Sequence, residues 1–246
     1  MTGKYKSLVV MARINLEMPL YLFWDVGGLG NPVSLYLATA GIGRLTLVDD
    51  DVVSLSNLHR QILFTENDIG LSKAEVAGKS LRHRNTDVEI ISVNDRLTAE
   101  NADKYVYGHD LVIIGSDNLD SRYLVNDMCC RYRIPFINAS VLGGEGEFTF
   151  FDIENGCYRC VFPEKPPENS IPLPEDIGVL GTSVGVIGTV AATMAVEVII
   201  GNKEYYINKL FVFNSIKLSM KAYCFSKDDN CPACSGGYFH ADLHKT

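Results

Sequence analysis

The sequence predicts an α/β fold, a doubly wound and mainly parallel Rossmann-like sheet with an antiparallel C-terminal extension and a zinc site made of four cysteines. Three observations predict this fold. Short apolar runs alternate with segments of helical period from about residue 20 to residue 139, as in βαβ units. A glycine-rich turn joins the first run to the first helical segment. Two Cys-x-x-Cys pairs follow in the second half of the chain.

Five apolar runs rich in β-branched and aromatic residues indicate buried strands: Pro19–Trp24, Leu45–Val48, Val88–Val93, Leu111–Ile114 and Pro135–Ala139. Three segments between them have the period of helices: Pro32–Ala40, Ser72–Arg84 and Leu119–Tyr132. Pro32 suits the first turn of a helix, and Ser72 with Glu75 three residues later is typical of a helix start.

The pattern changes after Ala139. Residues Glu147–Ile153 alternate like an antiparallel strand. A crossover with five prolines in thirteen residues, Phe162–Pro174, excludes regular structure and is a candidate mobile lid or docking segment. We then expect one more helix and a terminal hairpin: Ser183–Ile200, followed by Lys209–Asn214 and Lys217–Cys224.

Composition is that of an ordinary globular protein, with 246 residues, 47% of them hydrophobic and 21% charged. The length suits one domain over residues 1–246. A net charge of -8 repels phosphate backbones, so we expect no nucleic-acid partner. Clustered backbone N–H groups and cations can still bind a single nucleotide.

We expect a cytoplasmic protein, because Met1–Arg13 holds neither a signal-peptide core nor a cleavage site. Its seven cysteines are then thiols or metal ligands rather than disulfides. The apolar segment Leu180–Ile200 is marginal for a membrane span, and we favour a buried helix and no membrane partner. Its glycines, Gly181, Gly185 and Gly188, would let another helix or a second subunit approach closely.

The turn Gly27-Gly28-Leu29-Gly30 follows a strand and precedes a helix, where glycines bring backbone N–H groups close to a phosphate. The match to the dinucleotide pattern is imperfect, since Asp25 stands where a glycine is expected. An ordinary glycine turn is the alternative. Asp49 ends the next strand at the position of a ribose-binding carboxylate, although Asp49-Asp50-Asp51 could instead form a solvated loop.

The segment that follows, VVSLSNLHRQILFTENDIGLSK, resembles the ThiF/MoeB/HesA family, relatives of ubiquitin-activating enzymes. The resemblance extends from about Gly27 to Cys234 and includes the later motifs SDN, GCYRC and CPAC. It implies that Asp49 binds ribose, that Asn57, Arg60 and Lys73 contact the phosphates of ATP, and that Asp117 binds Mg²⁺. Arg60, Lys73 and Asp117 are the expected catalytic residues. The remaining nucleotide-binding residues would be Gly27, Gly28, Gly30, Asp51, Ser56, Leu58, Gln61 and Asn118.

Each of these residues has a structural alternative. Arg60 and Lys73 could be surface charges, Asn57 a turn residue and Asp117 the N-cap of the following helix. All lie just after a predicted strand or in the loop that leaves it, which is the edge where open sheets bind ligands.

The resemblance implies an ATP-dependent adenylyltransferase. Such an enzyme activates the C-terminal Gly-Gly carboxylate of a ubiquitin-like sulfur-carrier protein for thiamine or molybdopterin type sulfur transfer. Its cofactors would be ATP, Mg²⁺ and Zn²⁺, and it would be a homodimer. Residues 1–18 would form a poorly defined segment, residues 19–140 the nucleotide-binding half and residues 141–246 the carrier-binding half with the zinc knuckles.

Two cysteine pairs, Cys157-x-x-Cys160 and Cys231-x-x-Cys234, supply the four thiolates of a tetrahedral zinc site. A redox dithiol is the alternative, but it would sit at a helix N-terminus after a strand, and we expect neither pair there. Cys129 and Cys130 should be buried within a helix.

The sequence departs from the family in two places. Residues 170–174 hold no cysteine for a covalent sulfur or acyl step, and nothing before Gly27 matches the family's Arg-Tyr-x-Arg-Gln stretch. With Asp25, the second departure motivates a degenerate homologue that binds the carrier without efficient turnover. An NAD-dependent oxidoreductase would use the glycine turn and Asp49, but it leaves Arg60, Lys73 and the cysteine pairs unexplained.

Overall fold

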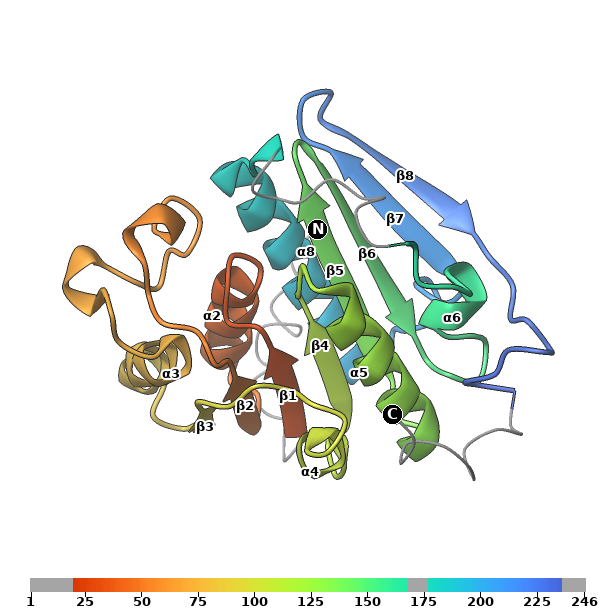
Figure 1. Cartoon of the computed structure of the whole chain (residues 1–246), viewed down its shortest axis with the longest axis horizontal. Coiled ribbons are helices and arrows are strands. Elements are labelled where there is room, and N and C mark those ends of the chain that lie inside the picture. Colours follow the sequence, from red (N-terminus) through yellow and green to blue (C-terminus); the bar gives the residue numbers. More distant parts are fainter. Residues whose placement is uncertain (1–19, 168–176, 236–246) are drawn as a thin grey trace, which may run out of the picture.

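The computed structural model describes residues 20–167 and 177–235. Its described strands form one eight-stranded sheet in the order β3-β2-β1-β4-β5-β6-β7-β8 (Figure 1). The strands are β1 (Leu20–Trp24), β2 (Arg44–Val48), β3 (Glu89–Val93), β4 (Leu111–Ile114), β5 (Phe136–Leu142), β6 (Glu145–Phe151), β7 (Lys209–Asn214) and β8 (Ser219–Cys224). The strands from β3 to β5 are parallel, and β6, β7 and β8 are antiparallel.

Helices cover both faces of the parallel part, as alternating strands and helices require. They are α2 (Gly30–Ala40), α3 (Lys73–Arg84), α4 (Ala102–Val106), α5 (Leu119–Tyr132), α6 (Tyr158–Val161) and α8 (Gly181–Ile199). Two 3-10 turns, η1 (Leu55–Asn57) and η2 (Glu66–Asp68), precede α3. One core joins α2, α3 and α8 to the sheet, and a second joins α4, α5 and α6 to its other face. In Figure 1, α5 lies in front of the sheet and α8 behind it.

The predicted α/β class, the parallel strands and the long helices are confirmed, while several bounds differ. The strand expected at Pro135–Ala139 runs to Leu142, because the turn Gly143-Gly144 pairs it with β6 in a long hairpin. The strand expected at Glu147–Ile153 is therefore shifted to Glu145–Phe151. The expected boundary between the nucleotide-binding half, residues 19–140, and the carrier-binding half, residues 141–246, falls within β5. One sheet therefore continues through both halves.

Helix α8 is the one described helix that is long and apolar enough to cross a membrane. It packs against α2, β5 and β6 and buries Val184, Ile187 and Ala191, as expected for a core helix. The close approach predicted at its glycines occurs at Gly188. A Cβ there would lie 2.4 Å from Cγ of Pro32 in α2. Gly185 has open space around it.

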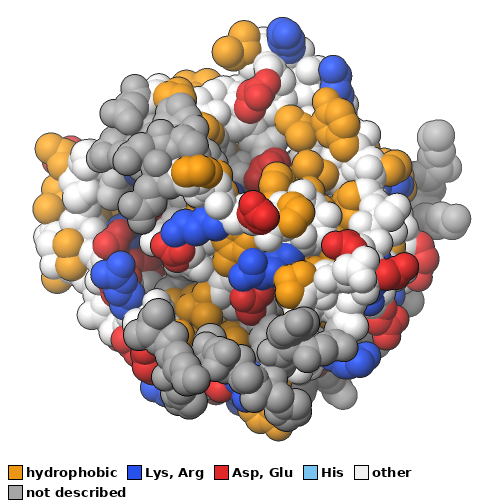
Figure 2. Space-filling model, turned by 45° about the vertical axis from the view of Figure 1, so that its right-hand side comes forward, with side chains coloured by type: hydrophobic (Ala, Val, Ile, Leu, Met, Phe, Trp, Pro, Cys, Tyr) orange, Lys and Arg blue, Asp and Glu red, His pale blue; other side chains and the backbone are white. Residues whose placement is uncertain are grey.

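The face of the molecule drawn in Figure 2 carries acidic, basic and hydrophobic side chains interspersed with one another. That face shows no extended basic area among the described residues. The predicted crossover loop is described only up to Pro167, so its remainder and all of Met1–Arg13 lie outside the described residues.

Candidate functional site

A crevice opens at the carboxyl ends of the parallel strands, where the strand order reverses between β1 and β4. Open α/β sheets bind ligands at this kind of switch point. The cavity has a volume of about 590 Å³. It is lined by Asp25, Asp49, Asp50, Asp51, Arg96, Leu97, Thr98, Ala99, Ser116, Asp117, Asn118, Asp120, Ser121 and Leu124.

Asp49 ties the end of β2 to the glycine turn. Its Oδ2 accepts a hydrogen bond from the N–H of Val26 at 2.8 Å, and its Oδ1 accepts one from the N–H of Asp51 at 2.8 Å. The residue is only 5% exposed. Burial raises the pKa of its carboxyl to about 6, while the Lys73 ammonium opposes that shift. The alternative of a solvated loop is thus wrong for Asp49, although Asp50 and Asp51 are exposed.

The glycine turn is held by Asn31, whose Nδ2 donates to the carbonyls of Val26 and Gly27 at 2.7 and 2.9 Å. The Oδ1 of Asn31 accepts from the N–H of Leu63 at 2.7 Å, which fixes the turn to the loop after η1. A Cβ at Gly28 would lie 2.9 Å from Cγ1 of Val184, so glycine is needed there for close packing. Gly30 begins α2.

Asp25 lies two residues before this turn and has a left-handed backbone, φ 71°. Its Oδ1 accepts a hydrogen bond from the N–H of Gly27 at 2.9 Å. Burial, followed by the negative charges of Asp49 and Asp117, raises the pKa of the Asp25 carboxyl to about 7. Asp25 lines the crevice together with Asp49 and Asp117, and three carboxyls in one lining are unfavourable for binding a phosphate without a cation.

The loop that carries the SNLHRQ motif lies against the turn. Nη2 of Arg60 donates to Oδ1 of Asn57 at 2.9 Å, and the aliphatic part of Arg60 lies 3.4 Å from the position of a Cβ on Gly28. Gln61 is buried, with its Nε2 3.6 Å from the position of a Cβ on Gly27. Two further predicted residues lie in the same loop, Ser56 in η1 and Leu58 directly after it.

Lys73 is the first residue of α3, and the side chain of Ser72 accepts the N–H of Glu75, as predicted for this helix start. Nζ of Lys73 pairs with Oδ2 of Asp51 at 2.7 Å. Burial lowers the pKa of Lys73, but the bond to Asp51 and the charge of Asp49 outweigh it, so the pKa is raised. The ammonium is therefore a fixed cation behind the acidic edge, not a surface charge.

Asp117 and Asn118 follow β4. Asn118 is the N-cap of α5, because its Oδ1 accepts the N–H of Asp120 at 2.8 Å and that of Ser121 at 3.4 Å. The alternative that assigned this cap to Asp117 is wrong, and Asp117 is left exposed at the crevice. Carboxylate oxygens are ligands that Mg²⁺ prefers. Asp117 is therefore a carboxylate in the crevice lining that could hold this ion.

Not every predicted residue lines the crevice. The predicted residues that are not in its lining are Gly27, Gly28, Gly30, Ser56, Asn57, Leu58, Arg60, Gln61 and Lys73. Sequence reasoning missed the segment from Arg96 to Ala99, which follows β3 and forms one wall. Its position could have been predicted from the sequence, because this segment also follows the carboxyl end of a parallel strand, where open sheets bind ligands.

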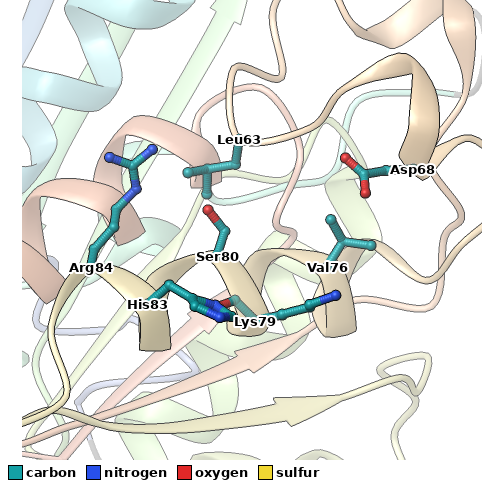
Figure 3. A pocket seen from close by; sticks show the side chains of 7 residues that line it. All are labelled: Leu63, Asp68, Val76, Lys79, Ser80, His83 and Arg84. Atoms are coloured by element: carbon teal, nitrogen blue, oxygen red, sulfur yellow. The ribbon is translucent and has the colours of Figure 1, made fainter.

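A second hollow, of about 380 Å³, lies along α3 (Figure 3). Lys79, His83 and Arg84 of α3 line it together with Leu63, and Ser80 points toward Leu63 in the close view. It contains none of the predicted site residues. The crevice at the strand ends is therefore the candidate nucleotide site.

The four predicted cysteines come together. The sulfur atoms of Cys157, Cys160, Cys231 and Cys234 lie within 4.8 Å of one another. The pairs across the cluster are 3.6 Å apart for Cys157 with Cys231 and 3.5 Å apart for Cys160 with Cys234. Zn–S bonds of about 2.3 Å in a tetrahedron place sulfur atoms about 3.8 Å apart. The cluster thus fits a zinc ion.

The expectation that neither pair lies at a helix N-terminus is wrong for the first pair, because Cys157 is the N-cap of α6. That helix has four residues, and its thiols face the second pair instead of an open surface. Arg159 of α6 anchors the knuckle to α5 through two bonds to the Asp127 carboxylate, 2.7 and 2.8 Å long. Cys129 and Cys130 are buried, as predicted.

Comparison with known proteins matches residues 25–233 to the ThiF family. The adenylyltransferase and sulfurtransferase MOCS3 of Aedes aegypti is 37% identical over 228 residues, which cover 92% of this chain and 52% of that protein. The chain thus spans about half the length of that relative. The SAMP-activating enzyme E1 of Haloferax volcanii is 36% identical over 211 residues, covering 86% of this chain and 78% of that protein.

Among solved structures, E. coli MccB with SeMet MccA matches with a TM-score of 0.80 and 26% identity, covering 92% of this chain and 69% of that one. The microcin C7 biosynthetic enzyme MccB in complex with N-formylated MccA has a TM-score of 0.83 at 24% identity, covering 94% of this chain and 72% of that one, and shows the fold alone. The family match, the identity to the Haloferax enzyme and the shared fold lead to one conclusion, that the chain belongs to the ThiF family.

Proposed function

We propose that this protein is an ATP-dependent adenylyltransferase that activates the C-terminal carboxylate of a ubiquitin-like sulfur-carrier protein ending in Gly-Gly. The observation that carries the proposal is the crevice between β1 and β4, with Asp49 and Asp117 in its lining and Lys73 fixed behind it. The names of the relatives, an adenylyltransferase and an E1 activating enzyme, support the same reaction.

In this reaction a carrier carboxylate oxygen attacks the α-phosphorus of ATP, the bond to the β-phosphate oxygen breaks, and pyrophosphate leaves. The attacking carboxylate is already ionised, so the site needs positioning and charge stabilisation more than acid–base chemistry. Asp49 would hold the ribose, and Arg60 with Asn57 would meet the phosphates. Lys73 would offset the charge that develops on the leaving group.

A magnesium ion would be held by Asp117, and when bound it would neutralise phosphate charge. A zinc ion would be held by the four clustered thiolates and would join the two cysteine pairs. The proposed cofactors are therefore ATP, Mg²⁺ and Zn²⁺. The thiolate cluster lies at the far end of α5 from Asn118, so zinc would have a structural role.

The partner is proposed to be a carrier of the thiamine or molybdopterin type, and the enzyme a cytoplasmic homodimer. Exposed apolar side chains of Val52, Leu55 and Ile62 lie beside the SNLHRQ loop. An apolar surface next to a site supports its use as a contact between proteins.

A degenerate homologue that binds the carrier without turnover is the second candidate, and Asp25 is the observation that favours it. The acidic turn would weaken ATP binding, while the rest of the fold would still present a carrier surface. An oxidoreductase that uses NAD has no comparable support, because the thiolate cluster and the Lys73–Asp51 pair have no part in hydride transfer.

Mass spectrometry of the carrier tests the proposal. A Gly-Gly-ended carrier is incubated with the enzyme, ATP, Mg²⁺ and inorganic pyrophosphatase, and the expected product is the carrier joined to AMP at its C-terminus. The same carrier without its last glycine is the control and should stay unmodified. A carrier that remains unmodified while it still binds the folded enzyme would support the degenerate homologue instead.

A further inference from the structure

The glycine turn already holds an anion of its own. The carboxylate of Asp25 accepts the N–H of Gly27 at 2.9 Å, and this N–H belongs to the turn that leads into the N-terminus of α2. Backbone N–H groups at such a turn are the donors that bind phosphate oxygens in nucleotide sites. One of these donors is therefore occupied from within the chain.

The fit between the carboxylate and the turn is close. A Cβ at Gly27 would lie 2.6 Å from Oδ1 of Asp25, so the oxygen sits directly over the backbone of the turn. Asp25 reaches this position because its backbone is left-handed, φ 71°, a conformation that glycine adopts freely and that a few polar residues tolerate. The side chain also lines the crevice with Asp49 and Asp117.

Charge makes the same contact unfavourable for a nucleotide. A phosphate that approached the N–H of Gly27 would meet the Asp25 carboxylate at hydrogen-bond distance from the same donor, with Asp49 and Asp117 lining the same crevice. The opposing cation, Lys73, is engaged by Asp51 at 2.7 Å. The phosphate therefore has to displace the carboxylate or stay away from the turn.

We propose that Asp25 is an internal stand-in for a nucleotide phosphate, which occupies the N–H of Gly27 and sets the affinity of the crevice for phosphate-bearing nucleotides. This inference rests on the proposed function, since it takes the crevice to be the ATP site. It assigns Asp25 the role of a binding determinant, not of a catalytic residue.

Calorimetry with ATP·Mg²⁺ and with adenosine, on the full chain and without carrier, tests this role. Asp25→Gly frees the N–H and removes the charge, so ATP should bind at least about tenfold more tightly than to the wild type, whereas adenosine should change less than about twofold. Asp25→Asn keeps an acceptor oxygen without the charge and should give an intermediate gain. Asp50→Asn is the matched control, because it removes a carboxyl from the same lining without touching the turn.

Three results would overturn the inference: ATP binding to Asp25→Gly that is no tighter than to the wild type, an equal gain for adenosine, or an equal gain from Asp50→Asn. Absence of ATP binding to both wild type and Asp25→Gly counts as the first of these. The outcome is separable from the proposed function. Tighter ATP binding to Asp25→Gly without any carrier adenylation would support the role of Asp25 and contradict the proposed adenylyltransferase function. Carrier adenylation with an unchanged ATP affinity of Asp25→Gly would support the proposed function and contradict the role of Asp25.

Discussion

The raised pKa of the Asp25 carboxyl should also make the stability of the protein depend on pH. In the folded protein burial and the charges of Asp49 and Asp117 raise its pKa from 3.8 to about 7, against the opposing charge of Lys73. A carboxyl whose folded pKa is raised stabilises the fold fully below its unfolded pKa, and this contribution is lost as the pH rises through the folded pKa.

The wild type should therefore lose more stability than Asp25→Asn between about pH 5 and about pH 8. A difference of roughly 1–3 kcal/mol is expected after allowance for the partial exposure of the side chain. Urea unfolding of both proteins, without nucleotide or metal, measures it. If the free energy of unfolding fell by the same amount in both proteins over this pH range, the pKa of the Asp25 carboxyl would not be raised in the folded protein.

Lys73 offers a second test at this scale. Lys73→Met removes the ammonium that Asp51 holds, and it should lower the rate of carrier adenylation by at least roughly 100-fold. The fold should persist, because the partner carboxylate of Asp51 is 70% exposed and remains solvated. Lys79→Met is the matched control, since Lys79 lies on the same helix but faces the other hollow. Similar rates for the two variants would remove Lys73 from the site.

Much of the residue-level site was predictable from the sequence, since strand ends bring side chains to one edge of a sheet. That rule placed Asp49 and Asp117 in the crevice. It could not show that Asn118 rather than Asp117 caps α5, because both residue types cap helices well. Nor could it show that the Asp25 carboxylate folds back onto Gly27, which depends on the value of one backbone angle.

At the scale of elements, the packing of α8 on α2 depends on one glycine. A Cβ at Gly188 would lie 2.4 Å from Pro32 and 2.9 Å from the carbonyl oxygen of Leu29, so Gly188→Ala must push the helices apart. We expect a loss of about 1–3 kcal/mol. Gly185→Ala, three residues earlier in an open position, should gain about 0.5–1 kcal/mol from helix propensity. Thermal unfolding of both variants compares them, and equal changes would contradict this packing.

The cluster of four cysteines is tested by removing one thiol. Cys160→Ser should lose the metal and destabilise the protein by about 2–4 kcal/mol, seen as a melting temperature lower by roughly 5–10 °C. Cys224→Ser is the control, because Cys224 lies exposed on β8 outside the cluster. Metal analysis of the purified proteins gives the stoichiometry. Full zinc occupancy in Cys160→Ser would refute the four-thiolate site.

Elements with strong periodicity were predicted well, and short ones were not. The helices α2, α3 and α5 agree with expectation to within a few residues. Helix α4 has five residues, too few for a periodic signal. The length of β5 was underestimated because its last residues, Ser140–Leu142, are held by pairing with β6 and not by burial on both faces.

For the whole molecule, one continuous sheet runs from the crevice at the strand ends toward the thiolate cluster. The crevice lies at the ends of β3, β2, β1 and β4. Beyond β5, the strands β6, β7 and β8 extend the sheet toward the chain's second cysteine pair. The parallel half and the antiparallel extension could be foreseen from the sequence, but not the strand order, since that follows from long-range pairing. The order places Asp49 and Asp117 on opposite sides of β1, which is why they face one cavity.

Activation of a carrier carboxylate by ATP in this cavity is the proposed function, and the roles proposed for its residues depend on it. It can be measured as the exchange of radiolabelled pyrophosphate into ATP, with the zinc-loaded protein, Mg²⁺ and a Gly-Gly-ended carrier. We expect exchange that requires the carrier and is lost in Lys73→Met. Absence of exchange with every Gly-Gly-ended carrier, from protein that retains its zinc and its fold, would contradict the proposed function.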